Sequence, residues 1–245
     1  GGRGHLYPVH DVVAVVVATA EAEQIEWLLE GDPSIRWQVM RDLLDVPRAE
    51  YEAERARVAE TGWGRRLLDE QDDDGRWAAD PKGNERYRGL YSPKWTSTTY
   101  TLVLLRRLGL EPGHPGAMAG CRALVERSQW EDDGSVRPWS GPSPDTCVSA
   151  MVLGLLEWFD YDAPDRRDGL AAYLLGAQQN DGGWNCDEDS SVGSFHTTIS
   201  TLEALQLRRS IDPDAGVDAA MERGHEYLLE RGLFRSRRTD EVVRP

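Results

Sequence analysis

Apolar residues gather in three segments of the chain, each of which starts with small or polar residues. We expect helices there over Thr96–Leu108, Thr146–Trp158 and His196–Leu207, which begin at residues 96, 146 and 196 and are therefore fifty residues apart. Apolar residues crowd all sides of these helices, as in Leu102–Leu105 and Met151–Leu156. Because a helix that is hydrophobic all round is buried, the pattern predicts three inner helices.

A repeated turn precedes each predicted inner helix. An apolar helical stretch ends on Gln, an acidic turn with Gly follows, and then comes Trp, in copies that span Leu67–Trp77, Leu124–Trp139 and Leu174–Trp184. Gly, Asp and Asn end helices, Gln can bond the backbone groups left free there, and Trp can cover the end of the next element. The helices before Gln, such as Arg167–Gln179, alternate their faces and suit an outer layer. The sequence therefore predicts an all-α chain, a curved stack of helical hairpins.

Further helices are expected on both sides of this array. They are Glu21–Leu29, Ser34–Val46, the exposed and charged Arg48–Glu60, and the outer helix Arg223–Leu233. The stretch Arg235–Pro245 is polar and supplies no inner partner for the last helix, so we expect the array to stay open, to be completed by a partner chain or a second copy, or to be truncated. We expect one domain over residues 1–245, with N-terminal helices in 1–60, hairpin repeats in 61–233 and a polar tail in 234–245.

Charge and cysteine content exclude several classes of protein. The formal net charge of −15 argues against nucleic acid, whose phosphates are held by clustered Lys and Arg, and against an anionic membrane surface. The longest apolar run, Val12–Ala20, is too short to span a bilayer and lacks the basic start and the cleavage site of a signal peptide. Cys121, Cys147 and Cys186 are too irregularly spaced for a disulfide framework. We therefore expect a cytoplasmic protein with reduced thiols.

The Gln-Gly-Trp hairpins, over roughly residues 60–233, resemble the repeats of squalene and oxidosqualene cyclases and of protein prenyltransferase β-subunits. The resemblance implies an α/α-toroid, here a partial or open α/α-barrel of inner and outer helices. Cyclases of that superfamily that start by protonation carry Asp-x-Asp-Asp at the start of an inner helix. The corresponding stretch here is Pro142–Cys147, which keeps only Asp145. The run Asp72–Asp74 lies in a turn instead and is read as a solvated acidic turn, so a protonating cyclase is disfavoured.

The same resemblance implies a zinc site. The prenyltransferase β-subunits carry Asp-x-Cys at one inner-helix start and a His-Thr pair at the next, which correspond here to Asp145-Thr146-Cys147 and His196-Thr197. Asp145, Cys147 and His196 are therefore the implied zinc ligands, in the first turns of neighbouring inner helices. One carboxylate, one thiolate and one imidazole with an open fourth position is a catalytic zinc arrangement, and this donor set favours Zn²⁺ over Mg²⁺ or Ca²⁺.

Other residues compete for the metal. Cys186 with Asp187 and Asp189 is a rival source of ligands, but we expect the Gly182–Asn185 turn to point Cys186 away from the inner axis. Read separately, Cys147 is a small buried hydrophobe, and Asp145 is an ordinary helix N-cap.

Most of the prenyltransferase diphosphate site is absent. The two basic residues that precede the zinc Asp in that family are replaced by Trp139 and Pro142, and the Tyr after the zinc Cys is replaced by Val148. Lys94 stands where the family has a His on the preceding inner helix. Protein prenylation is therefore not expected. Arg88 and Arg137 could join Lys94 in a different anion site, although each is as well explained as a solvated surface residue.

A pocket beside the metal is expected from residues near the inner-helix starts. They are Lys94, Trp95, Trp139, Trp184 and Phe195. For each of the four aromatic residues, core packing between repeats is at least as good an explanation.

Three functions follow as expectations. The first is a zinc-dependent transferase, cyclase or lyase acting on an apolar or isoprenoid-like small molecule, with zinc activating a thiol or water or polarising a carbonyl. The second is a terpenoid cyclase that uses a carboxylate outside the usual motif. The third is a non-catalytic helical-repeat scaffold whose concave face binds a protein or peptide.

Overall fold

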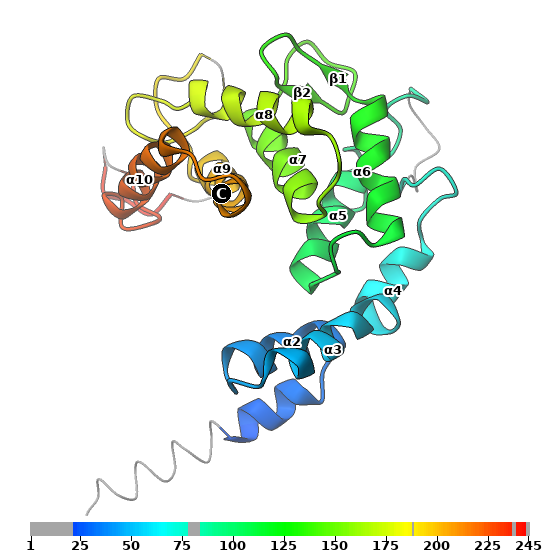
Figure 1. The fold of residues 1–245 in the computed structure, drawn as a ribbon. Helices are drawn as coiled ribbons and strands as arrows, with labels where there is room; N and C mark the ends of the chain where they lie inside the picture. Colours follow the sequence, from blue (N-terminus) through cyan, green and yellow to red (C-terminus); the bar gives the residue numbers. More distant parts are fainter. Residues whose placement is uncertain (1–21, 78–83, 188, 237–238, 244–245) are drawn as a thin grey trace, which may run out of the picture. The chain divides into compact units, whose positions relative to one another are not determined.

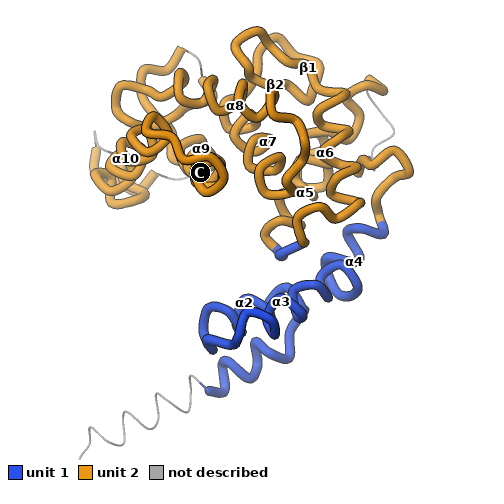
Figure 2. The backbone as a smooth tube through the Cα atoms, viewed as in Figure 1, with its two compact units in different colours: residues 1–69, 108–110 blue, residues 70–107, 111–245 orange. Residues whose placement is uncertain are grey.

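The computed structural model describes residues 22–77, 84–187, 189–236 and 239–243, and divides into two compact units (Figure 2). The first unit comprises residues 1–69 and 108–110, and the second comprises residues 70–107 and 111–245. The apolar run Val12–Ala20 lies outside the described residues. Among those that are described, helices predominate and the strands are short, so the prediction of an all-α chain is confirmed (Figure 1).

The first unit is built from helices in the N-terminal part of the chain. They are a helix over residues 22–29, α2 (Pro33–Asp42), α3 (Arg48–Ala56), a 3₁₀ turn η1 (Arg57–Ala59) and α4 (Gly62–Asp69). Its core holds Trp37, Val58 and Leu108. The Trp37 indole N–H donates to the carbonyl of Leu108 at 2.9 Å, which satisfies a polar atom that would otherwise be buried alone. The charged helix predicted over Arg48–Glu60 is confirmed for α3, which has no buried residue, but it ends at Ala56, and Val58 in the following 3₁₀ turn is buried in the core.

The second unit holds the remaining elements. They are α5 (Thr98–Leu108, its last residue excepted), α6 (Pro115–Arg127), β1 (Gln129–Trp130), β2 (Val136–Arg137), α7 (Thr146–Trp158), α8 (Pro164–Gly176), α9 (Phe195–Ile211) and α10 (Ala215–Leu229). Helix α7 has the predicted bounds, and it is buried on nearly every side as predicted. It packs against α9, α8, α6 and β2 (Figure 1). Helix α10 begins earlier than predicted because Asp214 caps it, accepting from the backbone N–H groups of Gly216 and Val217.

The first and third of the repeated turns share a hydrogen-bond pattern. Gln71 Nε2 donates to the carbonyls of Gly75 and Gly116, each at 2.8 Å. Gln178 Nε2 donates in the same way to the carbonyls of Gly182 and Ala220, also at 2.8 Å. In both copies, one amide group therefore joins the turn to the first half of the next outer helix, α6 or α10.

The turn glycines fit tightly against the outer helices. Gly182 has a φ of +86°, and a Cβ built there would lie 2.6 Å from the carbonyl oxygen of Arg223 in α10. Gly75 and Gly134 repeat this arrangement against α6 and α8. Only glycine combines this backbone conformation with so close an approach.

The backbone after each turn is bonded to a hydroxyl in the first half of the following helix. Trp77 N–H donates to Thr98 Oγ1 at 3.1 Å, and Trp184 N–H donates to Thr198 Oγ1 at 3.0 Å. In the second copy the donor is Val136, which bonds Ser149 Oγ at 3.2 Å. Val136 therefore takes the place that the sequence pattern gave to Trp139. Val136 stands two residues after Gly134, as Trp77 and Trp184 stand two residues after their turn glycines, so Trp139 falls three residues beyond the equivalent position.

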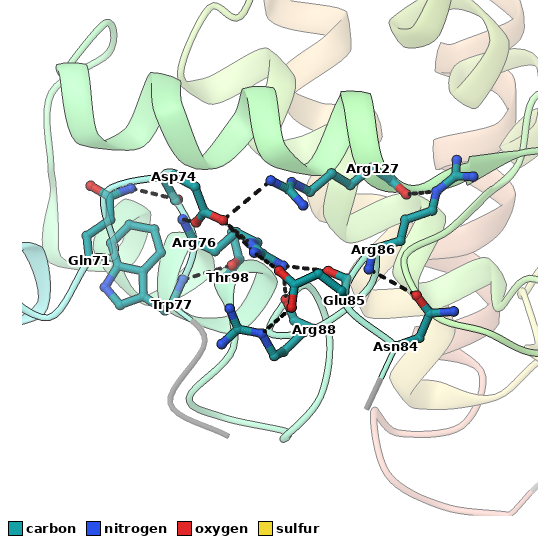
Figure 3. A network of polar contacts seen from close by, with 11 residues as sticks. Gln71, Asp74, Arg76, Trp77, Asn84, Glu85, Arg86, Arg88, Thr98 and Arg127 are labelled. Carbon is teal, nitrogen blue, oxygen red and sulfur yellow. Dashed lines mark hydrogen bonds and ion pairs between the residues drawn. The ribbon is translucent and has the colours of Figure 1, made fainter. Parts of the chain in front are cut away.

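The acidic run Asp72–Asp74 is not wholly solvated. Figure 3 shows Asp74 bonded to the guanidinium groups of Arg76 and Arg127. Arg76 is only 1% exposed, and it also donates to the carbonyls of Glu85 and Arg88. This arginine therefore fixes the segment over residues 85–88 to the turn. A hydrogen bond from Arg76 lowers the pKa of the Asp74 carboxyl.

Within the described part of the chain, we find no helix that is both long enough and apolar enough to cross a membrane.

Candidate functional site

A cavity of about 710 Å³ opens in the second unit, between one face of α7 and one face of α9. Helix α7 contributes residues spaced by three or four positions, as a single helix face requires, namely Cys147, Ala150, Met151, Gly154 and Leu155. Helix α9 contributes the corresponding set His196, Ile199, Ser200, Glu203 and Ala204. The remaining wall comes from α5, the segment that leads into it, and the loop before α9. The cavity is thus bounded by the buried helices that the sequence predicts.

Asp145 stands at the N-cap of α7 but does not cap it. Its side chain makes no capping hydrogen bond, whereas Ser194, at the N-cap of α9, accepts from the Thr197 backbone N–H at 3.2 Å. The Asp145 carboxyl is half-buried in the cavity wall. Burial raises its pKa, and the Lys94 ammonium partly opposes that shift. The carboxyl is therefore free for a role other than helix capping.

Cys147 follows as the second residue of α7 and meets Cys186 from the loop before α9. The Cys147 backbone N–H donates to Cys186 Sγ at 3.2 Å, and the Thr197 hydroxyl lies 3.3 Å from the same sulfur. Both cysteines line the cavity, and Cys147 is 7% exposed. The expectation that the Gly182–Asn185 turn points Cys186 off the inner axis was wrong, because the loop folds back onto the start of α7. Asp187 and Asp189 remain exposed and outside the cavity lining.

The two thiols differ in acidity because of these contacts. A hydrogen bond from Cys147, together with those from Thr197 and the Cys147 backbone, lowers the pKa of Cys186 to about 7, against the effect of burial. The same pairing and burial raise the pKa of Cys147. Cys121, buried in α6 and away from the cavity, has a pKa raised to about 12 by burial alone.

His196 is the second residue of α9, the position that Cys147 holds in α7. It is exposed at the cavity wall. The three residues for which the sequence implied a zinc ion therefore line one cavity, from two neighbouring helix starts. The part of the chain that the structure describes contains no group of three or more His, Cys, Asp or Glu side chains already gathered around a common point as metal ligands.

Aromatic rings form the wall beside Asp145. Trp95 and Lys94, both expected there, line the cavity, and Trp95 is 76% exposed. The Trp95 ring lies 5.0 Å from Tyr100, whose hydroxyl donates to the Tyr91 hydroxyl at 3.1 Å. Tyr91 and Tyr100, which sequence reasoning missed, therefore supply much of this wall. Their positions just before and within the first turn of α5 were the available signal.

Three other residues expected in the pocket do not line it. Trp184 is fully buried, and its indole N–H donates to the Leu174 carbonyl at 2.6 Å, which makes it a core residue between repeats. Trp139 lies behind the wall, with its ring 5.0 Å from that of Tyr91. Phe195 packs against Tyr227 with ring centroids 5.8 Å apart. Of the three, only Trp139 contacts a residue of the cavity wall, namely Tyr91.

Charged residues occupy another part of the cavity. Arg106 Nη2 on α5 bonds Glu203 Oε2 on α9 at 2.8 Å, and Arg107 Nη2 lies 3.5 Å from the other oxygen of the same carboxylate. None of these three residues stands out in the sequence. In sequence, a charged residue within an otherwise apolar helix is interpreted as a solvent-exposed position. The sequence pattern also does not show that α5 and α9 face each other.

Comparisons with known proteins add no relative to this picture: no family model matches the chain, and no curated protein matches its sequence. The resemblance to the cyclase and prenyltransferase repeats therefore rests on the residues themselves. The structure adds that the first and third turns share their Gln contacts and that Asp145, Cys147 and His196 line one cavity. The chain is predominantly helical, and its cavity at the starts of the buried helices is lined by two thiols and by aromatic and aliphatic side chains.

Proposed function

We propose that this chain is a zinc-dependent enzyme that acts on an apolar or isoprenoid-like small molecule in the cavity between α7 and α9. The observation that carries the proposal is that Asp145, Cys147 and His196 come from two neighbouring helix starts and line the same cavity. The proposed architecture is a partial α/α-toroid, open or completed by another chain. The proposed location is the cytoplasm, where thiols stay reduced.

The donor set fits zinc. A carboxylate, a thiolate and an imidazole are ordinary zinc ligands, and three of them leave one coordination position open for a reactant. The missing cap bond of Asp145 supports this assignment, because its carboxyl keeps all its acceptor sites. His196 is exposed, so its ring can turn at its side-chain torsions without displacing core residues. When bound, zinc would lower the pKa of a thiol or water or polarise a carbonyl.

The cavity walls favour an apolar substrate. Val103, Met151, Leu155 and Ile199 supply aliphatic surface, and Tyr91, Trp95 and Tyr100 supply aromatic surface. Two of the cavity's cations, Arg106 and Arg107, are engaged by Glu203. This leaves Lys94 beside Asp145 as the cation best placed to orient an anionic or carbonyl group near the proposed metal. In the proposed enzyme the chain's own residues thus bind and orient the substrate, with the apolar side chains along its length and Lys94 at its polar end.

The test is a metal-dependent turnover assay. Purified protein would be incubated with an isoprenyl diphosphate and a small thiol, and separately with linear polyenes, before and after removal of metal by a chelator. The proposal predicts product that disappears on metal removal and returns with zinc. Cys147→Ser should abolish that activity, while the matched variant Cys121→Ser, whose thiol lies outside the cavity, should retain it. Full activity of metal-free protein would overturn the proposal.

A second candidate is a terpenoid cyclase that protonates its substrate with Asp145. The observation that favours it is the aromatic wall of Tyr91, Trp95 and Tyr100 beside that carboxyl, because aromatic faces stabilise cations. It predicts cyclised product that chelators do not affect and that Asp145→Asn abolishes. A stable complex with a protein or peptide, without turnover of any isoprenoid, would instead favour a binding scaffold.

A further inference from the structure

Cys186 lies beside Cys147 in the cavity but is not among the proposed zinc ligands. Cys186 is held against the start of α7 by the Cys147 backbone N–H, which donates to Cys186 Sγ at 3.2 Å and so brings its sulfur to the residue that carries the second thiol. The loop that carries Cys186 is braced from within, since the Asn185 amide donates to Ser190 Oγ at 3.0 Å and to the Val192 carbonyl at 2.8 Å, and the Ser194 backbone N–H closes its base by donating to the Trp184 carbonyl at 2.7 Å. The fold therefore places the two cysteines next to each other, although they are 39 residues apart in the sequence.

The hydroxyl groups around Cys186 distinguish the two sulfurs. The Ser194 hydroxyl donates to Thr197 Oγ1 at 2.8 Å, and Thr197 Oγ1 is in turn in hydrogen-bond contact with Cys186 Sγ, 3.3 Å away. Cys186 therefore sits at the end of a short hydrogen-bond chain and also accepts from a helix N-terminus. Cys147 contributes the neighbouring thiol. Both line the cavity, so a small oxidant that enters it meets them, whereas Cys121 is fully buried elsewhere.

We propose that Cys186 and Cys147 form a reversible disulfide within the cavity, with Cys186 as the sulfur that a hydroperoxide oxidises first. In the first step the Cys186 sulfur attacks the O–O bond of hydrogen peroxide and becomes a sulfenic acid, and the other oxygen leaves as water with the thiol proton. In the second step the Cys147 sulfur attacks the sulfenic sulfur, the S–S bond forms, and a second water leaves. Two thiols are oxidised and one peroxide is reduced.

The disulfide would also regulate the proposed enzyme, and this clause alone rests on the proposed function. A Cys147 sulfur bonded to Cys186 is no longer a thiolate and cannot hold zinc. Oxidation would therefore release the metal, and reduction by a dithiol would restore the site. A peroxide-sensitive thiol pair of this kind suits a compartment in which disulfides are transient.

The experiment is peptide mapping of the full chain after treatment with one equivalent of hydrogen peroxide. Remaining thiols are alkylated in denaturant, the protein is digested without reduction, and linked peptides are identified by mass spectrometry. We expect one linked peptide pair that contains Cys147 and Cys186, with Cys121 alkylated, and its disappearance after dithiothreitol. The variant Cys121→Ser should give the same linked pair.

Two variants test the order of the steps. In Cys147→Ser, the sulfenic acid at Cys186 has no resolving thiol and should be trapped by dimedone. In Cys186→Ser, Cys147 should stay unoxidised at the same peroxide dose. The proposal is overturned if the unmutated protein gives no Cys147–Cys186 linkage, if Cys121 enters the linkage, or if dimedone labels Cys147 in place of Cys186.

Zinc content measured on the same samples separates this proposal from the proposed function. A linked pair in a protein that never binds zinc would leave the disulfide standing and remove the metal role. Zinc binding without a linked pair after oxidation would leave the metal site standing and overturn the disulfide.

Discussion

The backbone N–H of Cys147 donates a 3.2 Å hydrogen bond to the sulfur of Cys186. This bond joins the loop before α9 to the first turn of α7, although the two residues are 39 positions apart in the sequence. It brings the polar residues at two helix starts into the wall of one cavity, so that residues from successive repeats can act together. Both the fold around this relationship and the chemistry assigned to it are open to experiment.

The turn glycine Gly182 should tolerate no side chain. Its φ of +86° and the 2.6 Å distance from an added Cβ to the Arg223 carbonyl oxygen predict that Gly182→Ala lowers the free energy of unfolding by about 2–4 kcal/mol. The control is Gly176→Ala at the end of α8, where a Cβ meets nothing within 4 Å. That variant should be neutral or more stable by up to about 1 kcal/mol. Urea unfolding would measure both, and equal effects would contradict the account.

The Gln178 side chain should stabilise the packing of successive repeats. Gln178→Ala removes the donor to the Gly182 and Ala220 carbonyls, and we expect a loss of about 1–3 kcal/mol in the free energy of unfolding. The neighbouring Gln179→Ala is the matched control, because the bond to the Gly183 carbonyl at that position is made by the Gln179 backbone. A smaller effect of Gln178→Ala than of Gln179→Ala would be incompatible with the proposed role of the amide.

Acid should weaken the fold partly through Asp74. Its hydrogen bond from Arg76 holds its folded-state pKa below the ordinary value of 3.8. The stabilisation is therefore present above that ordinary value and is lost as the pH falls through the folded-state pKa. Unfolding free energies measured from about pH 6 to about pH 3 should fall more steeply for the unmutated chain than for Asp74→Asn. Asp73→Asn, in the same turn, should follow the unmutated curve.

The cavity should be sensitive to side-chain volume at Gly154. A Cβ there fits at 3.5 Å from Arg106 Nη1, but a larger side chain must extend into the cavity. We expect Gly154→Leu to weaken binding of a fluorescent isoprenoid alcohol by about tenfold or more, the loss of roughly 1.4 kcal/mol or more. Gly176→Leu, outside the cavity, should bind as the unmutated chain does. Thermal melts of both variants would establish that they remain folded.

The repeat pattern predicted the helices well because burial and turn chemistry are local signals. Thr146–Trp158 is the helix that the structure contains, since its apolar residues and the turn before it are both visible in sequence. The second copy misled at Trp139, because the match followed the residue type and not the spacing. The equivalent residue is Val136, which stands two residues after the turn glycine, as Trp77 and Trp184 do in the other copies.

The sequence brought together residues at helix starts and misplaced residues whose position depends on tertiary contacts, while the zinc-ligand role of the first group stays a prediction. Asp145, Cys147 and His196 line one cavity because equivalent positions of neighbouring repeats fall side by side. Cys186 was misplaced because the direction of its loop depends on Asn185 and on the α7 N-terminus, both set by the folded chain. Trp184 was wrongly predicted to line the pocket. In sequence, an aromatic residue that lines a cavity cannot be told from one that fills the core.

The metal content of the purified protein tests the central claim most directly. Protein prepared without chelators would be analysed for zinc and then reconstituted with Co²⁺, whose sulfur-to-metal charge-transfer absorption reports a thiolate ligand. We expect about one zinc per chain, the thiolate band in the unmutated protein and in Cys121→Ser, and loss of both zinc and band in Cys147→Ser. Absence of zinc from the unmutated chain, or zinc and a thiolate band retained in Cys147→Ser, would contradict the assignment of Asp145, Cys147 and His196 as a zinc site.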